Sequence, residues 1–345
     1  MHFSASYLKE YCEKIMTARG IDPDCAETVA DMLLDAELTG VSTHGVSRLA
    51  IYLERVERGL VSRHNDARIT RESASAVAID AGNSLGAVGA KFAMETCIRK
   101  ARETGCCFAT VKNSNHFGAA AYYTRMAARE GMIGFCCTNL TAKIAPHGAA
   151  EPFMGTDPIS VAVPSEGAPV VLDMTPSVVA LGKLILAQKL GKDIPLGWAL
   201  DRDGNPTTDP AAGRAGSLIP IGGPKGSGMA LIVEVLSGIL SGAGTATHLH
   251  DLYEFDAPQG VGHFLGAIDV SKFLDADVFR AGVSAMSGEI KSLKRAEGVD
   301  EILLPGERSA RSAEKKTKDG IDVPEAVCAE LNAMGEPFGM KLEEA

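Results

Sequence analysis

Predicted strands alternate with predicted helices through the middle of the chain. Of all the sequence features, this alternation most constrains the fold. The series is SAVAIDAG, GAVGAKFAMETCIRKARETG, CCFATVKN, AAAYYTRMAAREG and MIGFCCTNL, in which the first segment predicts a strand and the second a helix. PISVAVPSEGAPVVLDM then predicts a hairpin, ALGKLILAQKLG a helix, and WALDRDGNPTTDP a strand that leaves through a turn. Strands that alternate with helices in this way predict an α/β domain.

Helical periodicity dominates the residues before this region. YLKEYCEKIMTARG predicts one helix, and DPDCAETVADMLLDAELTG predicts a second, with Asp22 as N-cap and Pro23 at its first helical position. We expect Ser42 or Thr43 to cap a third helix that runs to about Gly59.

A shift in composition near residue 75 separates the N-terminal helices from the α/β region. Later in the chain follow the apolar helix MALIVEVLSGILSGA, the strand GHFLGAIDV and a charged C-terminal region. We expect residues 1–75 and 245–345 to pack together as a discontinuous helical domain, and residues 76–244 to form the α/β domain that binds cofactor and substrate.

Charge and composition exclude several classes of partner. The net charge is −10 and 46% of the residues are hydrophobic, so the chain can form a packed core but would repel nucleic acids and anionic membranes. The N-terminus lacks the pattern of a signal peptide, which predicts a cytoplasmic protein. The eight cysteines form no C-x-x-C motif and predict reduced, buried thiols, and we expect no metal site.

The stretch STHGVSRLAIYLERV places three polar side chains four residues apart, at His44, Arg48 and Tyr52. This spacing on a helix puts them on one face, where a single ligand could touch all three. His44 in the first turn would be held neutral by the helix dipole, and Arg48 could bind a carboxylate. The alternative is a solvated helix face on which Arg48 pairs with Glu54 or Glu57.

A second polar cluster, VKNSNHFG, lies between a predicted strand and a predicted helix and contains Asn115 and His116. Loops at strand ends commonly hold functional side chains, although Asn115 could instead cap the helix and His116 could be an ordinary loop histidine. Asp173 ends another strand, where it could accept hydrogen bonds from a ribose or cap a helix. GGPKGSG offers backbone amides and Lys225 to an anion, but the chain has no G-x-G-x-x-G fingerprint.

Two further motifs predict different chemistry. GNSLG fits the G-x-S-x-G pattern of a serine hydrolase, with Ser84 as nucleophile and His116 downstream, although the order of residues is wrong for that class. HLHD, from His248 to Asp251, could hold a metal through its imidazoles, but nothing nearby completes the coordination sphere.

The chain resembles the malate/L-lactate dehydrogenase family, which is unrelated to the Rossmann lactate and malate dehydrogenases. The resemblance rests on an ordered series that runs from about residue 4 to at least Arg308: STHGVSRL, VKNSNHFGAAAYYT, TNLTAKIAPHG, GTDPISVAVP, LDMTPS, DRDGNPTTDP, GGPKGSGMAL and LPGE. It implies a non-Rossmann NAD(P)-binding fold of the α/β (α+β) class, with a helical N-terminal domain and a mixed sheet. It also implies a homodimer whose active site lies near the subunit interface.

The resemblance assigns roles to individual residues. It implies His44 and His116 as the acid/base pair, without deciding which of them moves the proton. Substrate would be held by Arg48, Tyr52, Thr43 and Thr141. The residues implied for the cofactor are Asn139, Asp173, Met174, Thr175, Lys225, Pro305, Gly306 and Glu307.

These roles predict an NAD(P)-dependent oxidoreductase that interconverts a 2-hydroxy acid and its 2-keto acid, with malate as the first choice of substrate. Lys143 or His147 could bind the distal carboxylate of malate. Ureidoglycolate, lactate and sulfolactate dehydrogenases and keto or imino acid reductases are alternatives in the family, and Thr141 stands where the ureidoglycolate branch tends to carry an acid. A binding protein without activity is a further alternative. Asp173 favours NAD because it would repel a 2′-phosphate, whereas Arg308 and Arg311 leave NADP open.

Overall fold

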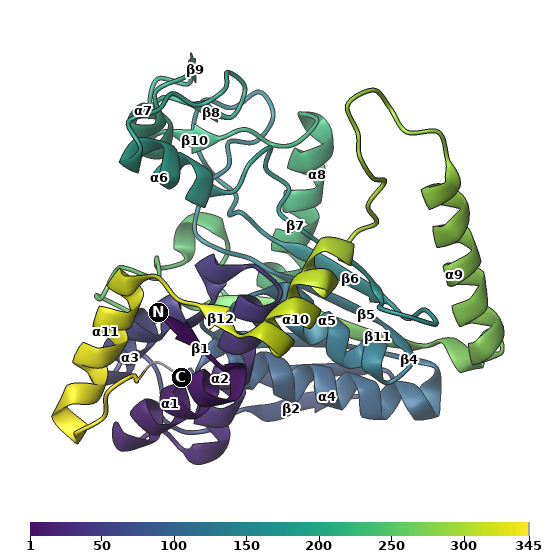
Figure 1. Cartoon of the computed structure of the whole chain (residues 1–345), viewed down its shortest axis with the longest axis horizontal. Helices are drawn as coiled ribbons and strands as arrows, with labels where there is room; N and C mark the ends of the chain where they lie inside the picture. Colours follow the sequence, from purple (N-terminus) through teal and green to yellow (C-terminus); the bar gives the residue numbers. More distant parts are fainter. Residues whose placement is uncertain (344–345) are drawn as a thin grey trace.

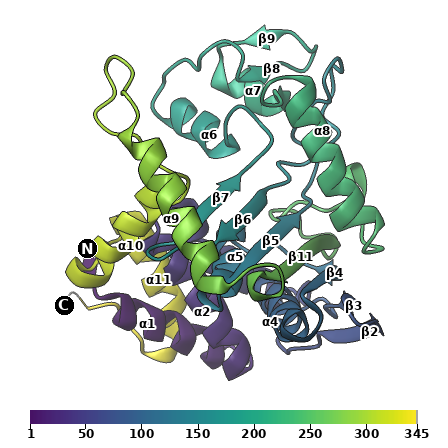
Figure 2. The ribbon, with the colours of Figure 1, turned by 90° about the vertical axis from the view of Figure 1, so that its right-hand side faces the viewer.

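One seven-stranded mixed sheet forms the centre of the computed structural model, which describes residues 1–343 (Figures 1 and 2). Strands β3 and β4 run parallel, whereas the other neighbouring pairs are antiparallel. The predicted α/β class with a mixed sheet is confirmed. In spatial order the strands are β2 (Arg68–Glu72), β3 (Ala76–Asp80), β4 (Cys106–Ser114), β11 (Val261–Asp269), β5 (Met132–Thr138), β6 (Ile159–Val163) and β7 (Val170–Met174).

Strand β11 lies in the middle of this sheet, although it comes late in the chain. It pairs with β4 on one side and β5 on the other, and His263 stands opposite both Val111 and Thr138. The strand predicted from GHFLGAIDV is therefore confirmed. The division into two domains stays a prediction, and β11 is the part of residues 245–345 that belongs to the sheet.

Helices cover both faces of the sheet. On one face α4 (Gly86–Thr104) packs against β4 and β11, and its neighbour α5 (Ala120–Arg129) packs against β5 and β6. On the other face α8 (Pro224–Val233) continues into a π-helix (Glu234–Ile239) that packs against β11, β4 and β5. The predicted apolar helix thus starts before Met229 and changes its hydrogen-bond pattern halfway along.

The two ends of the chain pack against each other beside the sheet (Figure 1). Helix α10 (Glu307–Asp319) contacts α2 (Pro23–Leu38), and α11 (Glu325–Gly335) contacts α3 (Leu49–Glu57). Strands β1 (His2–Phe3) and β12 (Ile321–Asp322) pair antiparallel, and α1 (Ala5–Ala18) packs on α2. Asp22 precedes α2 as predicted, but its carboxylate contacts His64 at 3.0 Å and makes no side-chain cap.

A smaller layer stands above the sheet edge and has its own apolar cluster around Ile144, Leu184 and Leu218. Helix α9 (Ala276–Ser292) has no buried residue and stands away from the body of the molecule (Figure 1). All eight cysteines are free thiols, and they are buried apart from the half-buried Cys106. Within residues 1–343, no helix has the length and hydropathy needed to cross a bilayer. The small layer contains α6 (Leu181–Lys189), β8 (Ala199–Leu200), β9 (Pro206–Thr207), α7 (Pro210–Ala215) and β10 (Ser217–Leu218).

Candidate active site

The chain between α2 and α3 is broken into two short 3₁₀ turns, Ser42–His44 and Val46–Arg48, and α3 begins only at Leu49. The single helix predicted from Ser42 or Thr43 to Gly59 is therefore wrong, and so is the helix-dipole argument for His44. Gly45 between the turns is extended, and a Cβ there would overlap the Glu37 side chain. Glu37 accepts a hydrogen bond from the Val46 N–H at 3.0 Å, which replaces the helical partner of that amide.

This broken segment brings His44 onto His116, which lies beyond the end of β4. The two imidazole rings stack with their centroids 5.6 Å apart and their planes at 23°. The Tyr52 hydroxyl lies 2.7 Å from His116 Nδ1, and the backbone N–H of Gly118 approaches the same nitrogen at 3.4 Å. His44 Nδ1 lies 3.0 Å from the Thr43 hydroxyl. Among the described residues, the Nε2 atoms of both histidines have no hydrogen-bond partner.

The Arg48 side chain lies near His44 and His116. Its Nε donates to the Thr43 carbonyl at 2.6 Å, and its Nη1 donates to the hydroxyl of Tyr253. The acids that could have held Arg48 on a wet helix face have other partners, because Glu54 pairs with Arg58 and Glu57 pairs with Arg19. The guanidinium is half-buried beside the histidines and could bind a carboxylate there.

Burial and nearby positive charge hold both imidazoles neutral. Desolvation, with a contribution from Arg48, lowers the pKa of His44 to about 4. Desolvation also lowers the pKa of His116 well below its usual value, and His44 and Arg48 act in the same direction. Desolvation raises the pKa of Tyr52, so its hydroxyl stays protonated. At neutral pH each histidine can therefore accept one proton at a ring nitrogen.

His116 is held by backbone as well as side-chain contacts. Its N–H donates to Oε1 of the buried Gln259 at 2.9 Å. Asn115 does not cap α5, because its amide donates to Asn83 Oδ1 at 3.0 Å and to the Ser84 carbonyl at 2.9 Å. The cap of α5 comes instead from Asp173, whose Oδ2 accepts from the Ala121 N–H at 3.0 Å.

The residues implied for the cofactor gather around β7. Desolvation raises the pKa of Asp173 to about 6, although its side chain still reaches solvent. The Val171 N–H donates to the Pro305 carbonyl at 3.0 Å, and Gly306 packs closely on Val171. Past the end of β7, the Ile221 N–H donates to the Pro176 carbonyl at 2.8 Å. The LPGE turn therefore lies beside β7, and the GGPKGSG turn lies beside the segment that follows β7.

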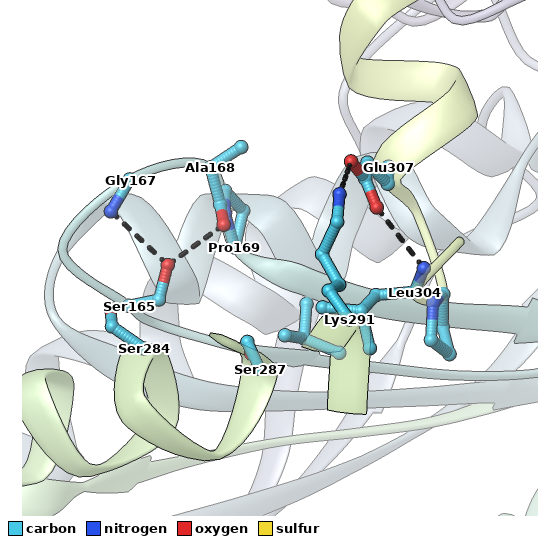
Figure 3. Close-up of a pocket in the computed structure, with 11 residues that line it drawn as sticks. Ser165, Gly167, Ala168, Pro169, Ser284, Ser287, Lys291, Leu304 and Glu307 are labelled. Atoms are coloured by element: carbon cyan, nitrogen blue, oxygen red, sulfur yellow. Dashed lines mark hydrogen bonds and ion pairs between the residues drawn. The ribbon is translucent and has the colours of Figure 1, made fainter. Parts of the chain in front are cut away.

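A cavity of about 280 Å³ opens between the β6–β7 turn, α9 and the LPGE turn (Figure 3). Glu307 is fixed there by Lys291 and by the Leu304 N–H, which donates to Oε2 at 3.1 Å. This cavity borders Pro305 and Glu307 but includes neither His44 nor His116.

Of the remaining residues of the implied cofactor set, Met174 and Thr175 lie at the end of β7, whereas Lys225 and Asn139 lie on other segments. Lys225 is exposed in the first turn of α8, which offers backbone amides to an anion. Thr175 contacts Ser177 at 2.8 Å, and Met174 is half-buried at the end of β7. Asn139 is fully buried, and its amide donates to Glu234 at 3.1 Å and to the Gly244 carbonyl at 2.9 Å. An accessible carboxylate, a lysine and a helix N-terminus around one strand suit a dinucleotide.

The sequence did not indicate the loop from Asp251 to Ala257 as part of the site. Asp251 accepts from the Thr141 hydroxyl at 3.1 Å and forms an ion pair with Lys143 at 3.3 Å, while Tyr253 meets Arg48. Asp251 therefore links this loop to Thr141 and Lys143. The segment HLHDLYEF combines an aromatic residue with acids in a polar loop, which is a weak sequence indication of a functional loop. Its place beside Arg48, Thr141 and Lys143 becomes clear only from the contacts in the structure.

Ser84 does not have the surroundings of a nucleophile. It is fully buried, and its hydroxyl donates to the His64 carbonyl and accepts from the Asp66 N–H, each at 3.0 Å. Both contacts are to backbone, so no imidazole activates the hydroxyl. The hydrolase interpretation of GNSLG therefore finds no support in the geometry.

Two stacked, neutral imidazoles beside a half-buried arginine suit acid/base chemistry on a substrate that carries a carboxylate. The model of the malate/L-lactate dehydrogenase family matches residues 3–332, and the chain belongs to this family. It is therefore an NAD(P)-dependent dehydrogenase of 2-hydroxy acids.

Individual relatives match over almost their whole length. A malate dehydrogenase from Pyrococcus horikoshii is 38% identical over 342 residues, covering 97% of this chain and 94% of the relative. The structure of malate dehydrogenase from Entamoeba histolytica superposes with a TM-score of 0.95 at 29% identity, covering 100% and 99%. That of sulfolactate dehydrogenase from Methanocaldococcus jannaschii gives 0.93 at 34% identity, covering 99% and 98%.

Proposed function

We propose that this chain is an NAD-dependent malate dehydrogenase in which Arg48 binds the substrate carboxylate and His116 moves the proton. The observation that carries the proposal is the contact of His116 with Tyr52 on one side and His44 on the other, with Arg48 adjacent. The similarity to a malate dehydrogenase at 38% identity supports malate as substrate.

The proton chemistry follows from the two ring nitrogens of His116. Tyr52 lies on the side of Nδ1, where its hydroxyl oxygen would accept from Nδ1–H in the tautomer that leaves the Nε2 lone pair free for the substrate hydroxyl. In the oxidation, Nε2 would accept the O–H proton of malate, and a bound nicotinamide would supply the acceptor for the C2 hydride, so that malate would become oxaloacetate. In the reduction, the imidazolium returns that proton to the keto oxygen.

His44 has a supporting role in this proposal. It is neutral and stacks on His116, and its own Nε2 can donate to or accept from the substrate oxygen. A neutral neighbour matters because a positive charge on His44 would oppose proton uptake by His116. Arg48 exchanges the Tyr253 hydroxyl for the substrate carboxylate and so fixes C2 in front of the imidazoles.

Asp173 supports NAD over NADP. The side chain reaches solvent at the end of β7 and has one hydrogen-bond donor, the Ala121 N–H, which leaves acceptor capacity for a ribose hydroxyl. Of the two arginines that left NADP open, Arg311 is occupied by Glu301 and Glu307. Arg308 alone would then have to attract a 2′-phosphate.

A homodimer in the cytoplasm completes the proposal. Apolar side chains lie exposed along α8 and the π-helix, at Leu231, Ile232, Val235 and Ile239, and α9 has no buried residue. Contiguous exposed apolar side chains favour contact with another chain, and the family resemblance makes a second copy the partner.

An absorbance assay at 340 nm tests the proposed activity. We expect malate with NAD to give the highest kcat/KM among malate, lactate, sulfolactate and ureidoglycolate, and NADP to be used at least ~10-fold less well, a difference of about 1.4 kcal/mol. A higher kcat/KM for another acid would reject malate as the main substrate, and a preference for NADP would reject the role of Asp173.

A further inference from the structure

A buried arginine holds the loop from Asp251 to Ala257 against helix α3. Arg55 is 1% exposed, and its Nη1 donates to the Leu252 carbonyl at 3.2 Å while its Nη2 donates to the Ala257 carbonyl at 2.9 Å. Because Tyr52 lies on the same helix, this loop keeps a fixed position relative to the predicted substrate site.

The fixed loop presents one carboxylate to two residues from beyond the end of β5. Asp251 Oδ2 accepts from the Thr141 hydroxyl at 3.1 Å and lies 3.3 Å from Lys143 Nζ. Its Oδ1 accepts from the Tyr253 N–H at 3.1 Å, and the Tyr253 hydroxyl contacts Arg48. A continuous chain of contacts thus joins the Asp251–Lys143 pair to the arginine that takes the substrate carboxylate.

Desolvation opposes ionisation of Asp251, but the Tyr253 N–H and Lys143 outweigh it and lower the pKa. The carboxylate is therefore ionised at neutral pH. Its side chain is 25% exposed and that of Lys143 is 39% exposed, so a small solute can reach both. The pair carries no net charge, and Lys143 attracts a second anion less strongly than an unpaired lysine would.

We propose that Asp251 sets the selectivity between 2-hydroxy acids with an anionic tail and those with a neutral tail, by neutralising Lys143 on the segment linked to Arg48 through Asp251 and Tyr253. This inference rests on the proposed function, in which Arg48 binds the C1 carboxylate. The distal carboxylate of malate must share Lys143 with Asp251, whereas the methyl group of lactate makes no such demand. Removing the charge of Asp251 then favours malate over lactate.

The test compares Asp251→Asn with wild type, using malate and lactate as the two substrates. Asparagine keeps the acceptor for the Tyr253 N–H and removes the charge, so we expect the malate-to-lactate ratio of kcat/KM to rise about tenfold, mostly through KM for malate. Lys143→Met should lower the ratio. The double variant should show no gain from Asp251→Asn, because the effect passes through Lys143.

Asp256→Asn is the matched control. It removes the same charge from the same loop, but Asp256 contacts His250 at 3.4 Å and not Lys143. Its ratio should stay within about twofold of wild type. An unchanged ratio in Asp251→Asn, or an equal change in both variants, overturns the inference.

Calorimetric titration with malate and with lactate separates this inference from the proposed function. The ratio of the two dissociation constants measures, without turnover, how strongly Lys143 attracts the anionic tail of malate. Wild type that turns over neither acid would reject the proposed function, while the shift in that ratio between wild type and Asp251→Asn would still decide the role of Asp251.

Discussion

His116 and Tyr52 form the contact on which the proposed chemistry depends most directly. Tyr52→Phe keeps the ring and removes the hydroxyl that lies 2.7 Å from Nδ1. We expect kcat to fall about 10- to 100-fold with little change in KM, because the substrate carboxylate is bound elsewhere. His116→Ala should reduce kcat by about 10²- to 10⁴-fold while NADH still binds, as measured by its fluorescence. Near-wild-type kcat in His116→Ala would exclude His116 as the proton-transfer group.

His263 shows how a single buried residue can make stability depend on pH. It is fully buried on β11, with Thr138 Oγ1 at 2.7 Å from Nδ1 and Ser114 Oγ at 2.7 Å from Nε2, and it stacks on Phe117. Desolvation lowers its pKa from 6.5 to about 3. The unfolded chain therefore binds a proton between pH 6.5 and 3 that the folded chain does not.

The sign follows from proton linkage. Because the unfolded state binds more protons, His263 makes the free energy of unfolding decrease as the pH falls below about 6.5, by at most about 1.4 kcal/mol per pH unit. His44, with a pKa of about 4, acts in the same direction, whereas the raised pKa of Asp173 acts in the opposite one. The pH dependence of the free energy of unfolding is thus the sum of the contributions of several residues. A variant is needed to measure the contribution of His263 alone.

His263→Gln removes one of these terms, so its destabilisation relative to wild type should be largest at pH 7.5 and shrink toward pH 4.5. Urea unfolding at several pH values measures this difference. His248→Gln, which replaces an exposed histidine whose Nδ1 approaches the Thr245 carbonyl, is the matched control for the exchange of histidine for glutamine. A pH-independent difference for His263→Gln would contradict the assignment.

At the scale of elements, the first residue of α4 sets the position of the loop that carries His116. A Cβ at Gly86 would overlap the carbonyl oxygens of Asn115 and His116, which are backbone atoms and cannot rotate away. We expect Gly86→Ala to lower the free energy of unfolding by about 1–3 kcal/mol and to reduce kcat/KM, since the loop must shift. Gly282→Ala in α9, where nothing lies within 4 Å, should be neutral or slightly stabilising.

Chemical unfolding and steady-state kinetics on both glycine variants check this prediction. Equal stability and activity of Gly86→Ala and wild type would show that α4 and the His116 loop are not packed as described. The control variant accounts for the general effect of replacing a helical glycine with alanine.

Helices and strands were predictable where the periodicity of the local sequence determines the secondary structure. The strand CCFATVKN and the helix that precedes it follow from periodicity, because burial alternates along the strand and recurs along one side of the helix. The helix expected from Ser42 fails for a tertiary reason, since Glu37 of another helix takes the Val46 N–H. The three side chains that the helix spacing predicted to face one ligand nevertheless lie together, because His44, Arg48 and Tyr52 all lie near His116.

At the scale of the whole molecule, sequence pattern could not supply the partners of distant segments. Asp251 was visible only as part of HLHD, because Thr141 and Lys143 lie far from it in the chain. The ordered motifs, taken together, predicted the family and the residues around β7, although none of them alone did so. Pairing of strands across long loops is decided by packing of the complete chain.

The central place of β11 has a consequence for synthesis of the protein on the ribosome. Strands β4 and β5 are complete by Thr138, yet the strand that joins them ends at Asp269. Until that segment has emerged, both strands have a free edge with unpaired backbone groups, which other chains could pair with. The sheet therefore closes in a late step, and nascent chains that stop before residue 261 lack the strand that unites its two halves.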